Sequence, residues 1–276
     1  MKHNVTAHIK ELNPNYTYEM KVKFIMSGGQ ESSVTLPAGV QEVNQTIAFE
    51  ESTNLDKMIW WTNDIGHPNI FTYQTTITCK NQSYSITRLI KTGFKTVTLK
   101  QTSDSIGKSF VLNLNGYDVY MRGGNYIPPE MSMARVHSST YEKVRKNAEF
   151  GRFNMIRLWG GGQFENNEFY DECDKAGILV WHDLMFACAL YPVFSESSNI
   201  DDIKQELTDN VLRIRNHPSI GLWNGNNEVW IGWQEWGWKN NKTESQKQIV
   251  ESMYRQIFQE ALPEVLSKLT PSIPYW

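Results

Sequence analysis

The sequence has few cysteines, no long apolar run and no excess of basic charge, and each absence excludes a class of protein. Three cysteines among 276 residues, Cys79, Cys173 and Cys188, have neither the number nor the spacing of a disulfide framework or a zinc site, so we expect buried free thiols. No run of about 18 apolar residues could cross a bilayer. A formal net charge of −3 gives no basic footprint for nucleic acid. We therefore expect no nucleic-acid or membrane partner.

Signals for a leader, a nucleotide or a metal are also missing. The opening segment MKHNVTAHIK lacks the apolar core of a signal peptide, although the compartment stays open because an upstream segment could have been removed. WGGGQF fits neither G-x-G-x-x-G nor the P-loop spacing. His182 and His217 have no further ligands at metal-site spacing. We predict no cofactor and no metal site.

What is present changes character near residue 108. Earlier runs alternate apolar and polar residues with period two and are rich in β-branched and aromatic side chains, which is typical of strands. These runs are YTYEMKVKFIM, VNQTIAFE, FTYQTTITC, YSITRLI and KTVTLKQ. Short strands separated by turns predict a β-sandwich domain over residues 1–108. Beyond the polar patch SDSIGKS, Asn115-Gly116 predicts a tight hairpin.

After residue 117 strands and helices alternate. The expected strands lie in VYMRGGNYI, FNMIRLWGGG, ILVWHDLMFACA and SIGLWNGNNE, and the helices in STYEKVRKNAEFG, NNEFYDECDKAG, NIDDIKQELTDNVLRIRNHP and TESQKQIVESMYRQIFQEALPEVLSKL. The first helix should have Ser139 or Thr140 as its N-cap and Gly151 just past its end. Such alternation predicts a parallel sheet, either doubly wound or a (β/α)8 barrel.

A TIM barrel is favoured, because the polar candidate residues all follow strands, at the edge where barrel enzymes assemble their sites. A barrel needs eight strands in about 250 residues, however, and only four are predicted here. We therefore expect residues 109–276 to form the N-terminal half of a barrel, truncated after the apolar segment TPSIPYW. Unpaired sheet edges in such a half-barrel would favour a homodimer or aggregation.

The stretch WNGNNE places one carboxylate, Glu228, at the end of a buried strand among three asparagines. Glycosidic hydrolysis needs a carboxyl group that donates a proton to the leaving oxygen, and neutral amides would avoid the lowered pKa that a nearby arginine causes. Asn227 could bind a sugar hydroxyl. The alternative is a polar turn with a solvated glutamate.

Tryptophans and one charged pair accompany this carboxylate. Trp159, followed by three glycines, offers a flat face for a sugar ring, and one or two of Trp230, Trp233, Trp236 and Trp238 should line a cleft. Trp181 and Trp223 should instead be core residues. Arg157 and Asp183 could pair to orient Glu228 or a substrate hydroxyl, or form a purely structural ion pair.

A second carboxylate is harder to find. On a helix, Glu235 would lie about 10.5 Å from Glu228, well beyond the roughly 5 to 5.5 Å of a retaining pair. Glu165 follows another strand and would need its loop to approach. Neither candidate is convincing.

Four motifs in order along the chain, RGGNYIPP, NMIRLWGGG, WHDLMFACA and WNGNNE, resemble the family 2 glycoside hydrolases and, among them, the β-mannosidases. WWTNDIGHPNIFTYQTTI and TGFKTVTLKQ are similar to the immunoglobulin-like domain that precedes the barrel in this family. The resemblance thus covers the whole chain. Asn-Asn-Glu, rather than the Asn-Glu surroundings typical of β-galactosidases, indicates a mannosidase; Asn224 replaces a more usual small residue or cysteine.

The resemblance implies a role for each candidate residue. Glu228 matches the general acid/base at the end of strand four, and Asn227 matches the neighbouring substrate-binding amide. Trp159 and Trp236 match tryptophans that shape the subsite for the terminal sugar. Arg157 and Asp183 match positions with supporting roles in substrate binding.

The implied activity is that of a retaining exo-glycosidase that hydrolyses terminal β-D-mannose from oligosaccharides or other glycosides, without metal or cofactor. The nucleophile of the family, a glutamate on the seventh strand, would lie beyond Trp276, and the amino-terminal jelly-roll domain is also missing, so this chain alone should be inactive. Full-length relatives would be periplasmic, secreted or lysosomal. The open alternatives are another family 2 specificity, namely β-glucosaminidase, β-galactosidase or β-glucuronidase, and a non-catalytic carbohydrate-binding fragment.

Overall fold

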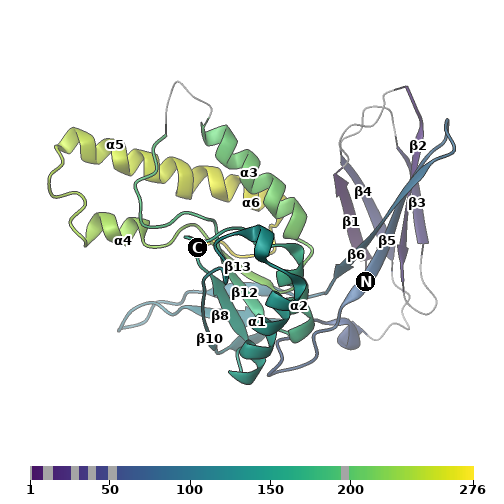
Figure 1. The fold of residues 1–276 in the computed structure, drawn as a ribbon, viewed down its shortest axis with the longest axis horizontal. Coiled ribbons are helices and arrows are strands. Elements are labelled where there is room, and N and C mark those ends of the chain that lie inside the picture. The colour runs from purple at the N-terminus through teal and green to yellow at the C-terminus, as the bar shows by residue number, and fades with distance from the viewer. Residues whose placement is uncertain (1, 9–14, 26–30, 37–41, 49–54, 194–198) are drawn as a thin grey trace. The chain divides into compact units, whose positions relative to one another are not determined.

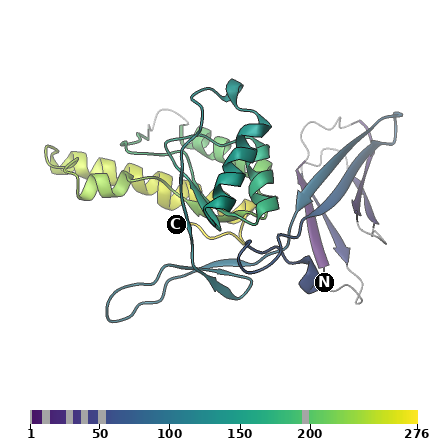
Figure 2. The ribbon, with the colours of Figure 1, turned by 60° about the horizontal axis from the view of Figure 1, so that its bottom comes forward.

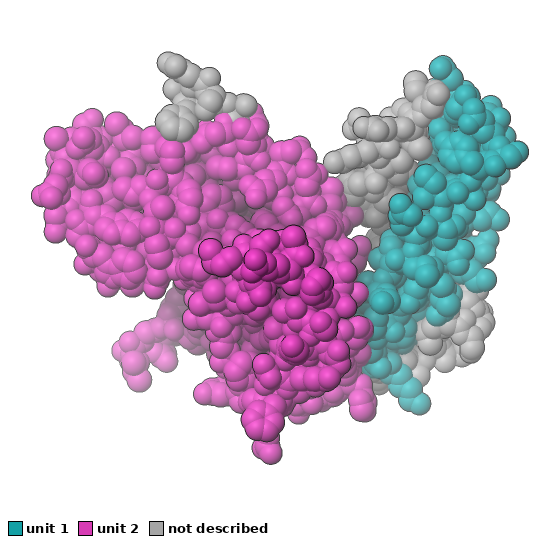
Figure 3. Space-filling model, in the orientation of Figure 1, with its two compact units in different colours: residues 1–59, 69–94 teal, residues 60–68, 95–276 magenta. Residues whose placement is uncertain are grey.

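The chain divides into two compact units (Figure 3). A computed structural model describes residues 2–8, 15–25, 31–36, 42–48, 55–193 and 199–276. The first unit comprises residues 1–59 and 69–94, and the second comprises residues 60–68 and 95–276. No helix in the described ranges is long and apolar enough to cross a membrane.

The first unit is built from antiparallel strands. β1 (Lys2–His8) pairs with β4 (Glu42–Ala48), and a second sheet has the order β3-β2-β5-β6. Its strands are β2 (Tyr18–Phe24), β3 (Glu31–Leu36), β5 (Phe71–Cys79) and β6 (Ser85–Thr92). Period-two alternation in β2 buries every second side chain, including Met20 and Val22, against a core that contains Tyr73. A short 3-10 turn (Leu55–Met58) follows β4 in the chain.

The second unit opens with a three-stranded antiparallel sheet. It consists of β7 (Val97–Lys100), β8 (Val111–Leu114) and β9 (Tyr117–Val119). Asn115 and Gly116 connect β8 to β9 with φ angles of 52° and 92°. Two successive positive φ angles are what a type I′ turn requires. The hairpin predicted at Asn115-Gly116 is confirmed.

Four parallel strands form the centre of the second unit (Figure 1). They are β10 (Gly123–Tyr126), β11 (Met155–Leu158), β12 (Leu179–Asp183) and β13 (Ile220–Asn224), adjacent in that order. Between them run a 3-10 turn (Met133–Arg135), α1 (Ser138–Phe150), α2 (Asn167–Ala176) and α3 (Asn199–Ile214). The predicted alternation of strands and helices around a parallel sheet is confirmed.

The start of α1 differs from the prediction. Its N-cap is His137, not Ser139 or Thr140, and the His137 N–H donates to Thr140 Oγ1 at 3.3 Å. Thr140 therefore satisfies a backbone donor from within the first turn instead of from the cap position. Gly151 is the C-cap, as predicted.

The predicted C-terminal helix is continuous but not uniform. It comprises α5 (Glu244–Tyr254), a π-helical segment (Arg255–Ala261) and α6 (Leu262–Leu269), and α4 (Val229–Gln234) precedes it. Pro263 lacks the N–H that a regular helix would bond to the previous turn, and the wider π segment lies directly before it. Figures 1 and 2 show α5, the π-helical segment and α6 as one long rod, and in Figure 1 α3 lies beside it.

The two faces of the parallel sheet differ. Ile156 and Val180 point into the main core, where helix residues such as Phe169 and Val211 cover them. Alternation sends Arg157 and Trp181 to the opposite face. Other strand residues in the main core are Leu158 and Trp223.

Of the two tryptophans predicted as core residues, only one is fully buried. Trp223 has no exposed surface. Trp181 is half-buried and stacks on Phe110 at 5.5 Å between ring centroids, so the prediction is wrong for Trp181. The reason is its strand parity, which places it on the face that the helices do not cover.

The outer edge of β13 is paired. Tyr275 forms a parallel bridge with Trp223, the Trp223 N–H donates to Pro274 O at 3.0 Å, and the Gly225 N–H donates to Trp276 O at 2.8 Å. Residues 274–276 therefore occupy the position of a further parallel strand beside β13.

Candidate active site

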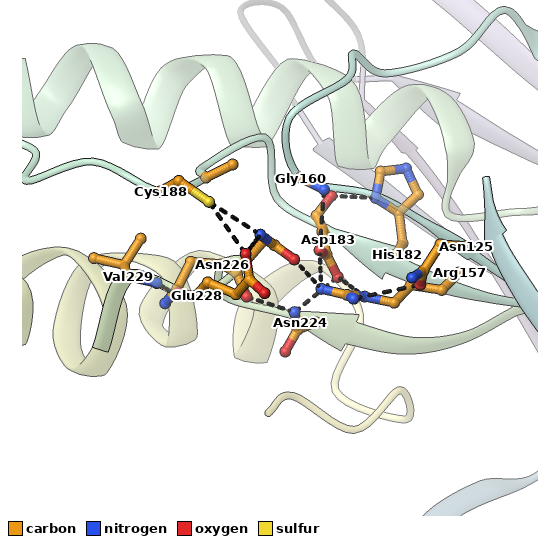
Figure 4. Close-up of polar contacts among 12 residues, drawn as sticks. Asn125, Arg157, Gly160, His182, Asp183, Cys188, Asn224, Asn226, Glu228 and Val229 are labelled. Atoms are coloured by element: carbon orange, nitrogen blue, oxygen red, sulfur yellow. Dashed lines mark hydrogen bonds and ion pairs between the residues drawn. The ribbon is translucent and has the colours of Figure 1, made fainter. Parts of the chain in front are cut away.

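The predicted polar residues converge at the C-terminal ends of the parallel strands (Figure 4). Arg157 lies near the end of β11 and Asp183 ends β12. Asn227 and Glu228 follow the end of β13. One network of hydrogen bonds joins all four of these residues.

Arg157 and Asp183 form a two-point ion pair. Arg157 Nη2 donates to Asp183 Oδ2 at 2.7 Å and Nε donates to Oδ1 at 3.2 Å. Asp183 is fully buried and also accepts from the Gly160 N–H at 3.0 Å and from Asn224 Nδ2 at 2.7 Å. Burial raises the pKa of the Asp183 carboxyl, while Arg157 and these hydrogen bonds act in the opposite direction. The pair is therefore a fixed anchor at the rim of the sheet.

Asn227 links this anchor to Glu228. Its Oδ1 accepts from Arg157 Nη2 at 2.8 Å, and its Nδ2 donates to Glu228 Oε2 at 2.8 Å. Because the guanidinium can only donate, the amide oxygen must face Arg157 and the amide nitrogen must face Glu228. Asn227 is 4% exposed, so packing also restrains this orientation.

Glu228 itself is exposed, at the N-cap of α4, with a left-handed φ of 62°. The prediction that three asparagines surround its carboxyl is wrong for two of them. Asn224 donates to Asp183 and to Asn226 O, and Asn226 Oδ1 accepts from the Val229 N–H at 3.1 Å. Both side chains stabilise the turn, and Asn227 alone reaches the carboxylate. No cation pairs with Glu228 among the ion pairs of the described residues.

Cys188 is a neighbour of Glu228 that the sequence did not single out. Its Sγ–H donates to Glu228 Oε2 at 3.2 Å, and Asn227 Nδ2 donates to the same sulfur at 3.4 Å. The expectation of buried thiols holds for Cys79 and Cys173 but is wrong for Cys188, which is exposed. Its place in WHDLMFACA, shortly after Asp183 at a strand end, was the available signal.

Backbone strain gathers at this site. Five non-glycine residues in the described ranges have positive φ, and three of them, Met185 (53°), Cys188 (46°) and Glu228 (62°), lie in the two loops that meet here. Each such conformation costs on the order of 1–3 kcal/mol and persists only where surrounding contacts enforce it. Clustering of this kind is typical of functional sites.

The glycines after Trp159 allow close packing. A Cβ on Gly160 would lie 2.7 Å from Phe186 O, and one on Gly161 would lie 2.0 Å from the Trp159 ring. The half-buried Trp159 side chain thus folds over Gly161. These glycines let the loop after β11 pack closely against the loop after β12.

The tryptophans after Glu228 separate into two groups. Trp233 is buried and its Nε1 donates to Glu251 at 3.1 Å, so it is a core residue. Trp230 is 40% exposed and Trp236 is 49% exposed. Trp236 packs edge-to-face against Trp238 at 6.0 Å, and no described contact joins it to Glu228.

A cleft of about 530 Å³ opens beside Glu228. Its size lies within the range usual for small-molecule sites. Trp230 is the tryptophan from the predicted set that lines it. The other lining residues are Asn224, Gly225, Asn226, Ile231, Tyr254, Phe258, Gln259, Tyr275 and Trp276.

Neither alternative carboxylate approaches Glu228 through a described contact. Glu165 is 1% exposed and accepts from the Tyr141 hydroxyl at 2.6 Å, and burial raises its pKa. Glu235 is exposed at the far end of α4. The described site therefore offers one unpaired carboxylate, Glu228.

The two histidines have different surroundings. His182 is buried between the Tyr170 hydroxyl (2.8 Å) and the Asp183 carbonyl (2.7 Å), and burial lowers its pKa to about 4. His217 Nδ1 lies 2.6 Å from Asp174 Oδ2. Together with Asp171 these two form a group whose potential ligand atoms lie within 4.8 Å of one another. Asp174 also accepts from the Ser219 N–H at 2.9 Å, so its two oxygens have protein partners of their own.

The chain is similar to fungal β-mannosidases. It is 31% identical to "Beta-mannosidase B" of Neosartorya fischeri over 267 residues, which are 92% of this chain and 31% of that protein. It is 31% identical to the protein of the same name from Aspergillus niger over 270 residues, 96% of this chain and 31% of the relative. The chain thus spans less than a third of the length of these relatives. No family model matches it.

Solved structures agree with this similarity. The β-D-mannosidase of Dictyoglomus thermophilum matches all of this chain with a TM-score of 0.83 and 28% identity, over 32% of its own length. A β-glucuronidase of Bacteroides uniformis matches 99% of the chain with a TM-score of 0.74 at 18% identity, which shows a shared fold. The resemblance predicted from the motifs is therefore confirmed: this is a glycosidase-like chain that resembles the family 2 β-mannosidases.

Proposed function

We propose that this chain is the central part of a retaining, exo-acting β-mannosidase and that Glu228 is its general acid/base. The observation that carries the proposal is the position of Glu228. It lies in the loop after the fourth parallel strand of a β-mannosidase-like chain, beside a cleft and without a cationic partner among the described ion pairs. An amide held by Arg157 contacts one of its oxygens.

We propose that residues 1–108 form an immunoglobulin-like β-sandwich and residues 109–276 the N-terminal half of a TIM barrel. Two antiparallel sheets in the first unit support the sandwich. The order β10-β11-β12-β13, with Tyr275 beside β13, supports a barrel whose strands continue past β13. The relatives are about three times as long as this chain and have room for the remaining strands.

In the proposed mechanism Glu228 donates a proton to the glycosidic oxygen as a nucleophilic carboxylate attacks the anomeric carbon. It then removes a proton from the water that releases the sugar. A retaining pair requires its carboxyl groups about 5 to 5.5 Å apart. No described contact brings a second carboxylate to Glu228, so we place the nucleophile in the part of the protein that this chain does not span. The isolated chain is expected to be inactive.

The other site residues bind or orient. Asn227 is placed to hold Glu228 and to offer its amide to a sugar hydroxyl. Arg157 and the buried Asp183 fix that amide. Trp159 and Trp236 are proposed to flank the terminal mannose, where flat apolar faces suit the C–H faces of a pyranose.

The second candidate is another family 2 specificity. A β-glucuronidase shares the fold of this chain, so the fold alone does not select the sugar. Release of nitrophenol from β-mannoside, β-glucoside, β-galactoside, β-glucuronide and β-glucosaminide substrates decides between them. The natural gene product that contains this chain should cleave the mannoside. Glu228→Gln should abolish this cleavage and the matched exposed variant Glu235→Gln should not. Cleavage of a different glycoside would change the proposed sugar specificity. Cleavage of none of the five substrates would refute the proposal that the protein is a glycosidase.

A further inference from the structure

The contacts of the Glu228 carboxyl are asymmetric. Asn227 Nδ2 (2.8 Å) and Cys188 Sγ (3.2 Å) both end on Oε2. No partner of Oε1 is found in the described part of the chain. A carboxyl that exchanges a proton with a substrate does so through one oxygen, and anchoring the other fixes where that oxygen points. The site thus has the form of a carboxyl held on one side.

The main chain places Cys188 against Glu228. The Asn227 N–H donates to Phe186 O at 2.8 Å, and the Cys188 N–H donates to Asn227 O at 3.0 Å. These two bonds continue the parallel ladder beyond the strand ends and fix the register between the loops. The Tyr191 hydroxyl bonds both the N–H and the carbonyl of Ala187 and supports the turn that holds Cys188 at a φ of 46°. These backbone and side-chain hydrogen bonds therefore fix the position of the loop that carries the thiol.

The thiol is suited to donate. Its hydrogen bond to Glu228 raises the pKa of the Cys188 thiol above its ordinary value. Among the described residues, Glu228 is the charged group that bonds to this thiol, and Arg157 lies beyond Asn227. A protonated thiol beside a carboxylate acts as an S–H donor.

We propose that Cys188 is a positioning residue for Glu228. Its S–H and the Asn227 amide together hold Oε2 and leave Oε1 to exchange the proton with the glycosidic oxygen. The chemical part of this proposal rests on the proposed function, whereas the contact between Cys188 and Glu228 rests on the geometry alone. Two measurements keep these parts separate.

The contact can be tested in this chain without any turnover. The rate at which iodoacetamide alkylates Cys188 at pH 8 is followed by mass spectrometry. Glu228→Gln should raise the rate by roughly threefold or more, because the neutral amide no longer opposes formation of the thiolate. The matched variant Glu235→Gln should alkylate like the parent, and Cys188→Ser reports the background from buried Cys79 and Cys173. Equal rates in the two glutamine variants would overturn the contact.

The positioning role is tested in the natural gene product with two substrates. Cleavage of β-1,4-mannobiose needs a protonated leaving group, whereas cleavage of dinitrophenyl β-mannoside needs it far less. Cys188→Ala should lower kcat/KM on mannobiose by roughly tenfold, a part of the 10²–10⁴-fold that a positioned acid supplies, with a much smaller loss on the dinitrophenyl substrate. Cys188→Ser, which keeps a donor, should recover most of the loss. Equal losses on both substrates, or none, would overturn the role. A parent that cleaves neither refutes the proposed function, and the alkylation test still decides the contact.

Discussion

At the scale of single residues, hydrogen-bond partners fix the orientation of the side chains that form the site. Arg157 can only donate, so the Asn227 amide must turn its nitrogen towards Glu228. The buried Asp183 in turn holds Arg157 from two points. Removing the carboxylate would leave a guanidinium with its main partner gone and a cavity at the strand end.

We expect Asp183→Ala to destabilise the second unit by roughly 3–5 kcal/mol, the usual cost of breaking a buried ion pair from one side. Asp118, which pairs with Lys100 on the surface, provides the matched control, and Asp118→Ala should cost less than about 1 kcal/mol. Urea unfolding monitored by tryptophan fluorescence gives both values. A similar small loss for the two variants would show that the Arg157–Asp183 pair does not anchor the fold.

His182 makes stability depend on pH. Burial lowers its folded-state pKa from 6.5 to about 4, so the unfolded chain binds the proton more readily. The stabilisation is therefore fully present above pH 6.5 and is lost as the pH falls towards 4, by on the order of 3 kcal/mol in total. Unfolding free energies measured across this window should fall less steeply in His182→Gln than in the parent. Equal slopes would mean that folding does not lower the pKa of His182.

At the scale of elements, three loops form the site, those that follow β11, β12 and β13. The first two approach so closely that Gly160 has no room for a side chain, since a Cβ would lie 2.7 Å from Phe186 O. The loop after β12 carries Cys188 and pairs with the backbone at Asn227. A displacement of the β12 loop would thus be transmitted to Glu228.

Gly160→Ala should therefore destabilise the second unit by roughly 1–3 kcal/mol, as is usual for overpacking, and should weaken the contact between Cys188 and Glu228. Gly107, around which nothing lies within 4 Å of an added Cβ, is the matched control. Thermal unfolding and Cys188 alkylation are measured for both alanine variants. If Gly160→Ala behaves like Gly107→Ala, the close approach of the loops is not a constraint.

The sequence predicted these elements better than it predicted their contacts. Strand and helix periodicity, the Asn115-Gly116 turn and Gly151 are local signals and were sufficient. The N-cap at His137, the exposed Cys188 and the different duties of Asn224 and Asn226 depend on how loops meet in space. A local sequence pattern does not predict contacts between loops. Only residues at strand ends, such as Asp183 and Glu228, could be predicted to lie close together.

At the scale of the whole molecule, the proposed function uses one described carboxylate, Glu228, as half of a glycosidase pair. Glu228 is exposed beside a cleft, Asp183 is used by Arg157, and Glu165 is buried against Tyr141. A retaining mechanism thus requires a nucleophile from outside these residues. This requirement agrees with the length of the relatives, since the chain covers only 31% of "Beta-mannosidase B" of Neosartorya fischeri.

The central claim is that Glu228 is the acid/base of a retaining enzyme, and rescue by azide tests it most directly. Glu228→Ala in the natural gene product is given dinitrophenyl β-mannoside with and without azide, and the product is identified by NMR. We predict that azide accelerates turnover and yields β-mannosyl azide, because the small anion attacks the glycosyl-enzyme from the face that Glu228 has vacated. An α-mannosyl azide would identify Glu228 as the nucleophile, and turnover unaffected by azide would contradict a role for Glu228 in the reaction.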